Sequence, residues 1–189
     1  NPLAAVIVRF PGAIIVLIVI LLISGVSMRL PRRDMLICWG LGVLVGAQSY
    51  TLYKSFAVIP VALTMIIFYV YPLIVGVVAG LTGQDRISPP LAVALVTAFA
   101  GLVLVFNVSG ADLSGAGALY AFLSALFWSA MTLLSVRVMR DCDPRAVSLN
   151  MQVSAATIFI VIWLVSGGVT LPSSTFGWVS FLAMPVCYA

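Results

Sequence analysis

Histidine and glutamate are absent from this 189-residue chain, and only 7% of its residues are charged. The acidic side chains are five aspartates, all in polar breaks or at the ends of apolar stretches: Asp34, Asp85, Asp112, Asp141 and Asp143. Intramembrane hydrolases, metalloenzymes and proton relays need an acid, a base or a metal ligand at depth. We therefore expect no enzymatic activity, no catalytic residue, no metal site and no cofactor.

Cysteine is also scarce. Cys38, Cys142 and Cys187 show neither the spacing of a disulfide framework nor that of a metal site, and we expect all three to be bystanders. The net charge of +4 is not concentrated in a basic run interleaved with aromatic residues. A nucleic acid is therefore not expected as a partner.

Apolar residues make up 63% of the chain, more than a soluble domain of this size can bury. Crossing a bilayer takes about 20 helical residues. Six stretches approach or exceed that length: Leu3–Ser24, Met35–Ala57, Val61–Leu81, Pro90–Val108, Gly117–Met139 and Ala146–Leu164. A seventh, from Phe176 to Ala189, is too short and looks cut off. We predict an all-α polytopic membrane protein, and we expect this chain to be an internal fragment of a longer one.

The loop arginines all lie on one side of the predicted spans. When the connections are threaded alternately, that side receives Arg29, Arg32, Arg33, Arg86, Arg137, Arg140 and Arg145. Only Arg9 and Lys54 lie towards the other side, both within apolar sequence. Lys and Arg in short loops mark the cytoplasmic face. We therefore expect a protein of the plasma membrane (the inner membrane in a bacterium), whose first span runs from outside to inside.

The second span carries two contrasting faces. Gly42-x-x-x-Gly46 and Ser49 cluster on one side of a helix, which suits close packing in lipid. An arc roughly opposite holds Gln48, Thr51, Lys54 and Ser55. Polar side chains at this depth either line a wet cavity or form hydrogen bonds between helices, and for Gln48 and Thr51 both interpretations stay open. Lys54 either borders the cavity or extends its ammonium group to the outer interface.

The third span has a proline at its centre. Pro72 removes a backbone hydrogen bond, which a membrane tolerates only where protein or water satisfies the released carbonyl. Transporters place substrate sites at such broken helices, whereas a simple packing kink is the other interpretation. In a continuous helix Tyr69 aligns with Gly76-x-x-x-Gly80, while Thr64, Phe68 and Tyr71 share a different face.

Two further features concern possible site residues. In the fifth span Ser124, Trp128, Thr132 and Ser135 form one stripe, and Trp128 either completes a packing face or caps an apolar substrate pocket. Arg9 is buried if the first helix begins near Leu3, and interfacial if Pro11 is the first helical residue. No intramembrane carboxylate of this chain can pair with Arg9. If it is buried, its partner is a residue of missing sequence, a backbone carbonyl, water or an anionic ligand.

Several ordered motifs resemble the drug/metabolite transporter superfamily, in particular its EamA-like permeases. They are Asn1-Pro2 with Val8-Arg9-Phe10, then Ala57–Pro60 with Tyr71-Pro72-Leu73, then Asp85-Arg86-Ile87-Ser88, and finally Gly115–Arg137 with Trp128. The third motif departs from the family, which usually has Glu at the position of Asp85. The resemblance implies ten helices built as two inverted five-helix repeats. On that basis residues 1–109 form the first repeat without its first helix, and residues 110–189 begin the second.

We accordingly predict a permease that moves a small organic metabolite or drug, outward, by alternating access. Its expected site residues are Gln48, Thr51, Tyr71, Pro72 and Trp128, with Lys54 and Arg9 making the outer vestibule positive and favouring a carboxylate-bearing solute. The expected partners are this solute, the lipid bilayer and, as one option for assembly, a second copy forming a homodimer. The alternatives are a non-catalytic membrane subunit of a larger transport complex, such as an ATP-driven importer, and then a membrane-embedded enzyme.

Overall fold

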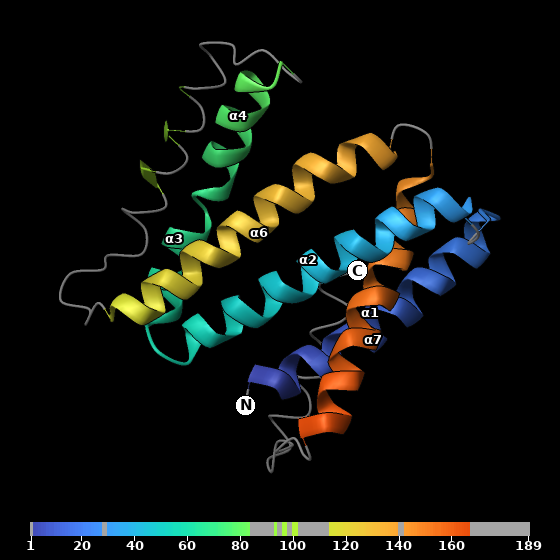
Figure 1. Cartoon of the computed structure of the whole chain (residues 1–189), viewed down its shortest axis with the longest axis horizontal. Coiled ribbons are helices and arrows are strands. Elements are labelled where there is room, and N and C mark those ends of the chain that lie inside the picture. Colours follow the sequence, from blue (N-terminus) through green and yellow to red (C-terminus); the bar gives the residue numbers. More distant parts are fainter. Residues whose placement is uncertain are drawn as a thin grey trace. The chain divides into compact units, whose positions relative to one another are not determined.

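The computed structural model describes residues 2–27, 30–83, 93, 96–97, 100–101, 114–139 and 142–166, without the side chains of residues 1–9, 137–138, 163 and 165–166. Within these residues the chain is helical (Figure 1). The helices are α1 (Pro2–Ser24), α2 (Arg32–Phe56), α3 (Val61–Phe68), α4 (Tyr71–Leu81), α6 (Gly115–Met139) and α7 (Pro144–Ser166). The all-α prediction is confirmed for this part of the chain.

The helix bounds follow the predicted spans closely. Among the described residues, four segments are long and apolar enough to cross a membrane: Arg32–Phe56, Val61–Leu81 (α3 and α4 together), Gly115–Val136 and Pro144–Ile162. A shorter apolar stretch, Phe10–Ser24, belongs to α1. The predicted spans 90–108 and 176–189 lie largely or wholly outside the described residues. So do Arg29, Asp85–Ser88, Asp112, Arg140, Asp141 and Cys187, and the side chains of Arg9 and Arg137.

The side chains reverse the pattern of a water-soluble protein. Gln48, Ser49, Ser55, Thr64 and Ser124 are completely buried. The outer surface instead exposes large apolar side chains from every helix, including Ile23, Leu36, Leu81, Leu119 and Leu164. Water would penalise this arrangement, whereas lipid favours apolar groups outside and polar groups paired inside. The structure therefore fits a membrane-embedded protein.

The described helices divide into two compact units, 1–46 with 134–189 and 47–133, so α2 and α6 contribute to both. In the first unit α1 packs along α7 (Figure 1). Phe10 stacks on Phe159 with ring centroids 5.7 Å apart, and Leu17 and Leu21 pack against Leu149. Because the residue numbers rise on one helix as they fall on the other, α1 and α7 are antiparallel.

In the same unit α2 runs parallel to α7. The Cys142 thiol, just before α7, donates to the Asp34 carboxylate at 3.6 Å, and the Ser154 hydroxyl donates to the Trp39 carbonyl at 2.8 Å. A Cβ atom at Gly42 would lie 2.5 Å from the Ser154 Cβ atom. Only glycine permits this approach, so the prediction of a small packing face on the second span is confirmed at Gly42.

Helix ends in the first unit have local signals. Asp143 caps α7, because its carboxylate accepts the Arg145 N–H at 2.8 Å, and Pro144 occupies the first helical position. Gly25 ends α1 with φ of 64°, and the Val26 N–H then donates to the Leu21 carbonyl.

The alternative in which α1 begins at Pro11 is wrong, since the helix starts at Pro2 and continues through Pro11. Arg9 therefore lies within helical backbone.

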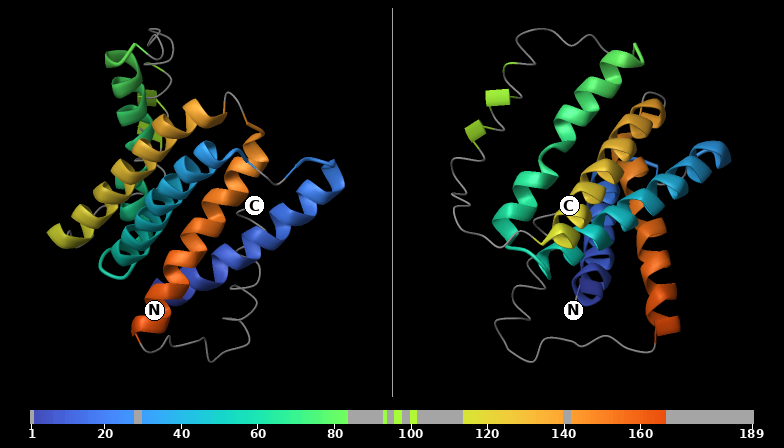
Figure 2. Two further views of the ribbon diagram at one scale, coloured as in Figure 1. Left: turned by 45° about the vertical axis from the view of Figure 1, so that its right-hand side comes forward. Right: turned by 60° about the vertical axis from the view of Figure 1, so that its left-hand side comes forward.

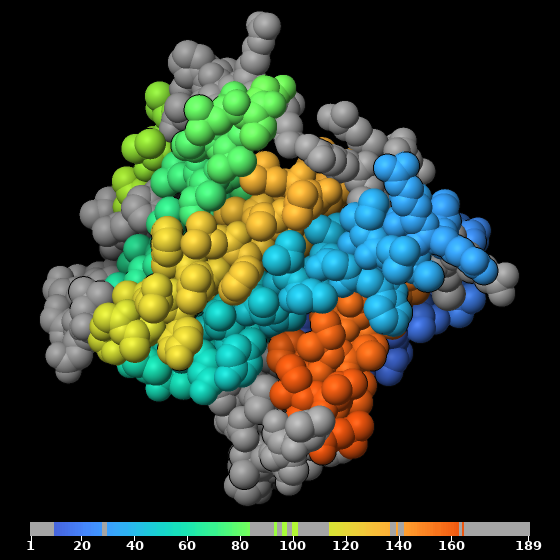
Figure 3. Space-filling view, viewed as in Figure 1, coloured from blue at the N-terminus to red at the C-terminus, as the bar shows by residue number. Residues whose placement is uncertain are grey.

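In the second unit α6 packs against the end of α2 and against α3 and α4. The Ser55 hydroxyl donates to the Gly117 carbonyl at 2.9 Å, and Gln48 bonds Ser124, so α2 and α6 are antiparallel. In the space-filling view these ends of α2 and α6 are in direct contact (Figure 3). A Cβ atom at Gly117 would lie 2.5 Å from Ile59, and Ser129 contacts Tyr71, so α6 runs parallel to α3 and α4.

These directions agree with the alternate threading of the predicted spans, in which the first, third and fifth spans run one way and the second and sixth run the other. The two contact units do not follow the predicted boundary between residues 109 and 110. Contact units group helices by packing, whereas the predicted repeats group them by symmetry, so the repeat boundary stays a prediction.

Candidate functional site

The third predicted span is interrupted at its centre, where α3 ends at Phe68 and α4 begins at Tyr71. Figure 2 shows the uncoiled link between the two helices. Pro72 has no N–H, so the Phe68 carbonyl loses the donor that a continuous helix would supply. The Leu73 and Ile74 N–H groups both donate to the Val70 carbonyl, at 3.0 and 3.2 Å. Pro72 thus marks a two-residue interruption of the helix, in which Tyr69 and Val70 keep a near-helical backbone.

Four aromatic side chains gather at this break, and we call Phe68, Tyr69, Tyr71 and Trp128 the aromatic cluster. The Tyr71 ring centroid lies 5.2 Å from Phe68, 6.2 Å from Tyr69 and 6.3 Å from Trp128. Trp128 meets both Phe68 and Tyr71 edge to face. Phe68, Tyr71 and Trp128 are half-buried, and Tyr69 is exposed. The cluster therefore combines fixed rings with accessible ring surface.

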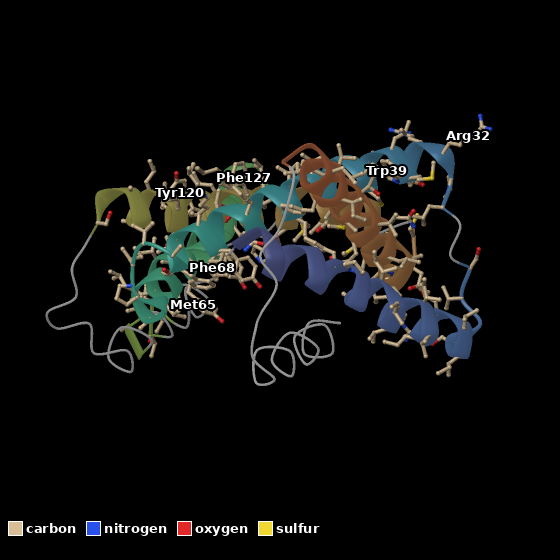
Figure 4. The ribbon with its side chains drawn as sticks, turned by 90° about the horizontal axis from the view of Figure 1, so that it is seen from below. Arg32, Trp39, Met65, Phe68, Tyr120 and Phe127 are labelled. Atoms are coloured by element: carbon tan, nitrogen blue, oxygen red, sulfur yellow. The ribbon has the colours of Figure 1, made fainter. Side chains whose placement is uncertain are left out.

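Ser129 of α6 forms a hydrogen bond to the backbone at the break. The Ser129 hydroxyl lies 2.7 Å from the Ala125 carbonyl of its own helix and 3.2 Å from the Tyr71 carbonyl. Its single proton is shared between two backbone acceptors, so Ser129 holds the chain next to Pro72 in place. Figure 4 shows Phe68 on α3 and Phe127 on α6 among the neighbouring side chains.

Polar side chains between α2 and α6 are buried and bonded to one another. The Gln48 amide donates to the Ser124 hydroxyl at 3.2 Å and accepts from the Ser49 hydroxyl at 3.2 Å. Nearer the end of α2, Ser55 and Thr64 share a hydrogen bond of 2.9 Å. These contacts favour interhelical hydrogen bonding for Gln48, one of its two predicted roles.

Thr51 and Lys54 have local partners. The Thr51 hydroxyl lies 2.9 and 3.0 Å from the Ala47 and Gln48 carbonyls, and so bonds its own helix. The Lys54 ammonium group lies 5.7 Å from the Tyr50 ring centroid, within cation–π range. Lys54 is half-buried.

The predicted site residues fall at two different levels. Lys54 follows Gln48 by six residues on α2, and Trp128 follows Ser124 by four residues on the antiparallel α6, so the two lie on opposite sides of the Gln48–Ser124 contact. At about 1.5 Å per helical residue, Lys54 and Trp128 are separated by roughly 15 Å along the helices. Tyr71, Pro72 and Trp128 come together, Gln48 and Thr51 lie between the levels, and Arg9 belongs to the other unit with no described side chain.

Sequence reasoning missed two contributors. Tyr69 was placed on a different face from Phe68 and Tyr71 because a continuous helix was assumed, and that placement is wrong, since its ring lies beside both. The break after Phe68 turns it into the cluster, and Pro72 was the available signal. Ser129 lies one residue outside the stripe of Ser124 and Trp128, and no pattern in the sequence singled it out.

Comparison with known proteins shows a similarity of fold. No family model matches the chain, and no curated protein matches it. One solved chain, described only as "Crystal structure of protein", matches with a TM-score of 0.78 at 20% sequence identity. The fold is shared. The match covers 98% of this chain and 66% of the solved chain, so this chain spans about two thirds of the length of its structural neighbour.

Proposed function

We propose that this chain belongs to a membrane permease that moves a small organic solute by alternating access, in the direction of export. The observation that carries the proposal is the helix break at Tyr69–Val70, with an aromatic cluster beside it, in the centre of an apolar span. Irregular backbone at membrane depth is tolerated where it lines a cavity or is buried in protein. Secondary transporters bind their substrates at such discontinuous helices.

The proposed architecture is a ten-helix protein of two inverted five-helix repeats. In that scheme α1 and α7 are the second helices of the two repeats, and inverted equivalents must run in opposite directions. Their antiparallel packing through Phe10 and Phe159 supports this assignment.

The proposed roles follow the two levels of the site. Tyr71 and Trp128 contact the solute, and Pro72 keeps the wall irregular. Gln48 and Thr51 shape the side of the cavity between the levels through their bonds to Ser124 and to helical carbonyls. Lys54 and Arg9 are the cations proposed for the outer vestibule. The arginine-bearing loops face the cytoplasm of the plasma membrane.

Transport by the purified full-length protein in proteoliposomes tests the proposal. A mixture of labelled metabolites should include at least one solute that moves faster than through empty liposomes. Trp128→Ala and Gln48→Ala should each lower its rate several-fold while expression and monodispersity are retained. Trp39→Ala, on the exposed surface of α2, is the matched control and should transport normally. Normal transport by both site variants would show that the cavity has been placed wrongly.

A non-catalytic membrane subunit is the rival function, since apolar helices alone also suit that role. It predicts no flux through the isolated protein and co-purification with an ATPase. The same proteoliposomes and a pull-down from native membranes separate the two.

A further inference from the structure

We propose that the first half of α2 binds one anionic phospholipid, whose phosphate group contacts Arg32 and Arg33. Its acyl chain lies along three apolar residues of the same exposed face: Leu36, Trp39 and Val43. None of these residues is proposed to contact the transported solute, so the lipid site stands or falls independently of transport.

An exposed stripe runs along the first half of α2. Arg32, Leu36, Trp39 and Val43 follow one another at steps of four, three and four residues, which keeps them within about 60° of one another around a helix. Arg32 is exposed, and the other three side chains are 69%, 43% and 51% exposed. Figure 4 shows Arg32 and Trp39 on this helix, with Arg32 at its end. The stripe therefore has a charge at one end and apolar side chains along the rest, as a phospholipid has.

The length of the stripe matches one leaflet of a bilayer. From Arg32 to Val43 the helix rises about 16 Å, at about 1.5 Å per residue. Half of a hydrocarbon core of about 30 Å is about 15 Å. The predicted topology puts Arg32 at the cytoplasmic surface, where anionic lipids give the membrane a negative potential. A lipid with its headgroup at Arg32 would thus reach Val43 with its acyl chain.

The arginines at this end of α2 are available to a phosphate group. Arg33 is also exposed and lies about 100° round the helix from Arg32. Asp34, the one carboxylate of α2, accepts a hydrogen bond from the Cys142 thiol. Within the part of the chain that the structure describes, neither Arg32 nor Arg33 forms an ion pair. Guanidinium groups bind phosphate oxygens through paired N–H donors, so the two arginines suit a phosphate headgroup.

The stripe suits a lipid better than another helix. Helices that pack in lipid favour small residues at their contacts. The face of α2 that packs on α7 follows this rule, since a Cβ atom at Gly42 would lie 2.5 Å from Ser154. The stripe instead carries three large apolar side chains, and a Cβ atom at Gly40 beside them would meet nothing within 4 Å.

Quenching of Trp39 fluorescence by brominated lipids tests the proposal. The full-length protein is placed in nanodiscs that contain phosphatidylglycerol and phosphatidylcholine with matched acyl chains, and bromine is carried on the chains of one lipid or the other. The Trp39 emission is the difference between the protein and its Trp39→Phe variant. At equal mole fraction we expect phosphatidylglycerol to occupy the stripe roughly 5- to 30-fold more strongly, the range of one or two arginine contacts.

Two results of this measurement would overturn the proposal. Equal quenching by the two brominated lipids would show that the stripe does not select an anionic lipid. Quenching by neither would show that another helix of the full-length protein covers the stripe.

Charge variants separate a defined site from a diffuse basic surface. Arg32→Gln should lower the preference for phosphatidylglycerol roughly 3- to 5-fold, as expected for one arginine near the membrane surface. Arg145→Gln is the matched control, because Arg145 is exposed at the start of the neighbouring α7 but does not lie on the stripe, and the preference should change less than about twofold. Equal losses in the two variants would contradict the site. Should Arg32→Gln not fold, Arg33→Gln makes the same comparison.

Free phosphate is the other source of the same chemistry. Inorganic phosphate, compared with chloride at equal ionic strength, should leave quenching by brominated phosphatidylglycerol unchanged, because the acyl chain also holds the lipid at the stripe. A specific loss of quenching in phosphate would show that the arginines bind a free anion instead. At about 1 M salt, where the Debye length is about 3 Å, the preference for phosphatidylglycerol should shrink. A preference that salt does not change would contradict an arginine–phosphate contact.

Discussion

Gly42 is the residue at which close helix packing is most demanding. A Cβ atom there would lie 2.5 Å from the Ser154 Cβ atom and 2.6 Å from the Met151 carbonyl oxygen, and the latter belongs to backbone that cannot rotate away. Ser154 also ties α7 to α2 through the Trp39 carbonyl. The contact between these helices therefore depends on the missing side chain.

Gly42→Ala should destabilise the protein by about 1–3 kcal/mol, because the added methyl group forces α2 and α7 apart. The measurement is the thermal unfolding midpoint of the purified protein in detergent. Gly40→Ala is the matched control, since a Cβ atom at Gly40 meets nothing within 4 Å and alanine favours the helix. Equal midpoints for the two variants would show that α2 and α7 do not approach this closely.

The role of Gln48 has two interpretations until its hydrogen-bond partner is known. Its position in the second span predicted either a wet cavity or a bond between helices. In the structure its side chain is fully buried, with Ser124 and Ser49 as partners 76 residues and one residue away. A distant partner of this kind is invisible to periodicity.

At the scale of the element, the link between α3 and α4 is the decisive feature. A continuous helix would place Tyr69 and Tyr71 on opposite faces, whereas here their rings are neighbours, and Phe68 and Tyr71 contact Trp128. Proline in a helix interior costs about 3 kcal/mol, so a proline at the centre of an apolar span implies compensation from its surroundings. Ser129 adds a hydrogen bond between α6 and this link by donating to the Tyr71 carbonyl.

Pro72→Ala should straighten this span, because the restored N–H can bond the Phe68 carbonyl. Spin labels at Val61 and Leu81, which are 56% and 84% exposed, report the separation of its ends by double electron–electron resonance. The mean distance should lengthen towards the roughly 30 Å rise of a continuous helix, and solute transport should fall. Pro60→Ala, just before α3, is the control and should change neither. An unchanged distance would place the cause of the break elsewhere.

At the scale of the whole molecule, the distribution of charge and the directions of the helices agree. The contacts within each unit make α1 antiparallel to α7, α2 parallel to α7 and α2 antiparallel to α6. Alternate threading of the predicted spans gives the same relations. The orientation relative to the two sides of the membrane stays a prediction, which rests on the arginines alone.

Cysteine labelling in intact cells tests this orientation. In a background without Cys38, Cys142 and Cys187, Val58→Cys should react with a membrane-impermeant maleimide from outside, and Arg145→Cys only after permeabilisation. Both positions are exposed in the structure. The opposite labelling pattern would invert the predicted topology and place Lys54 at the cytoplasmic end.

For the described part of the chain, the sequence by itself determined that it is helical, where its apolar helices begin and end to within a few residues, and which of them run in the same direction. Those properties depend on hydrophobic length and on charge in the loops, and both are local. It also predicted that Tyr71 and Trp128 lie close together, and their rings are in contact.

Only the tertiary structure decided that Ser124 is the partner of Gln48, that Tyr69 joins the aromatic cluster, and that Lys54 lies at a different level. Each of these depends on how one helix is placed and rotated against another, or on the break that ends the helical period after Phe68. In lipid that placement is set by close contacts and shared hydrogen bonds rather than by hydrophobicity, so a hydrophobic pattern carries little information about it.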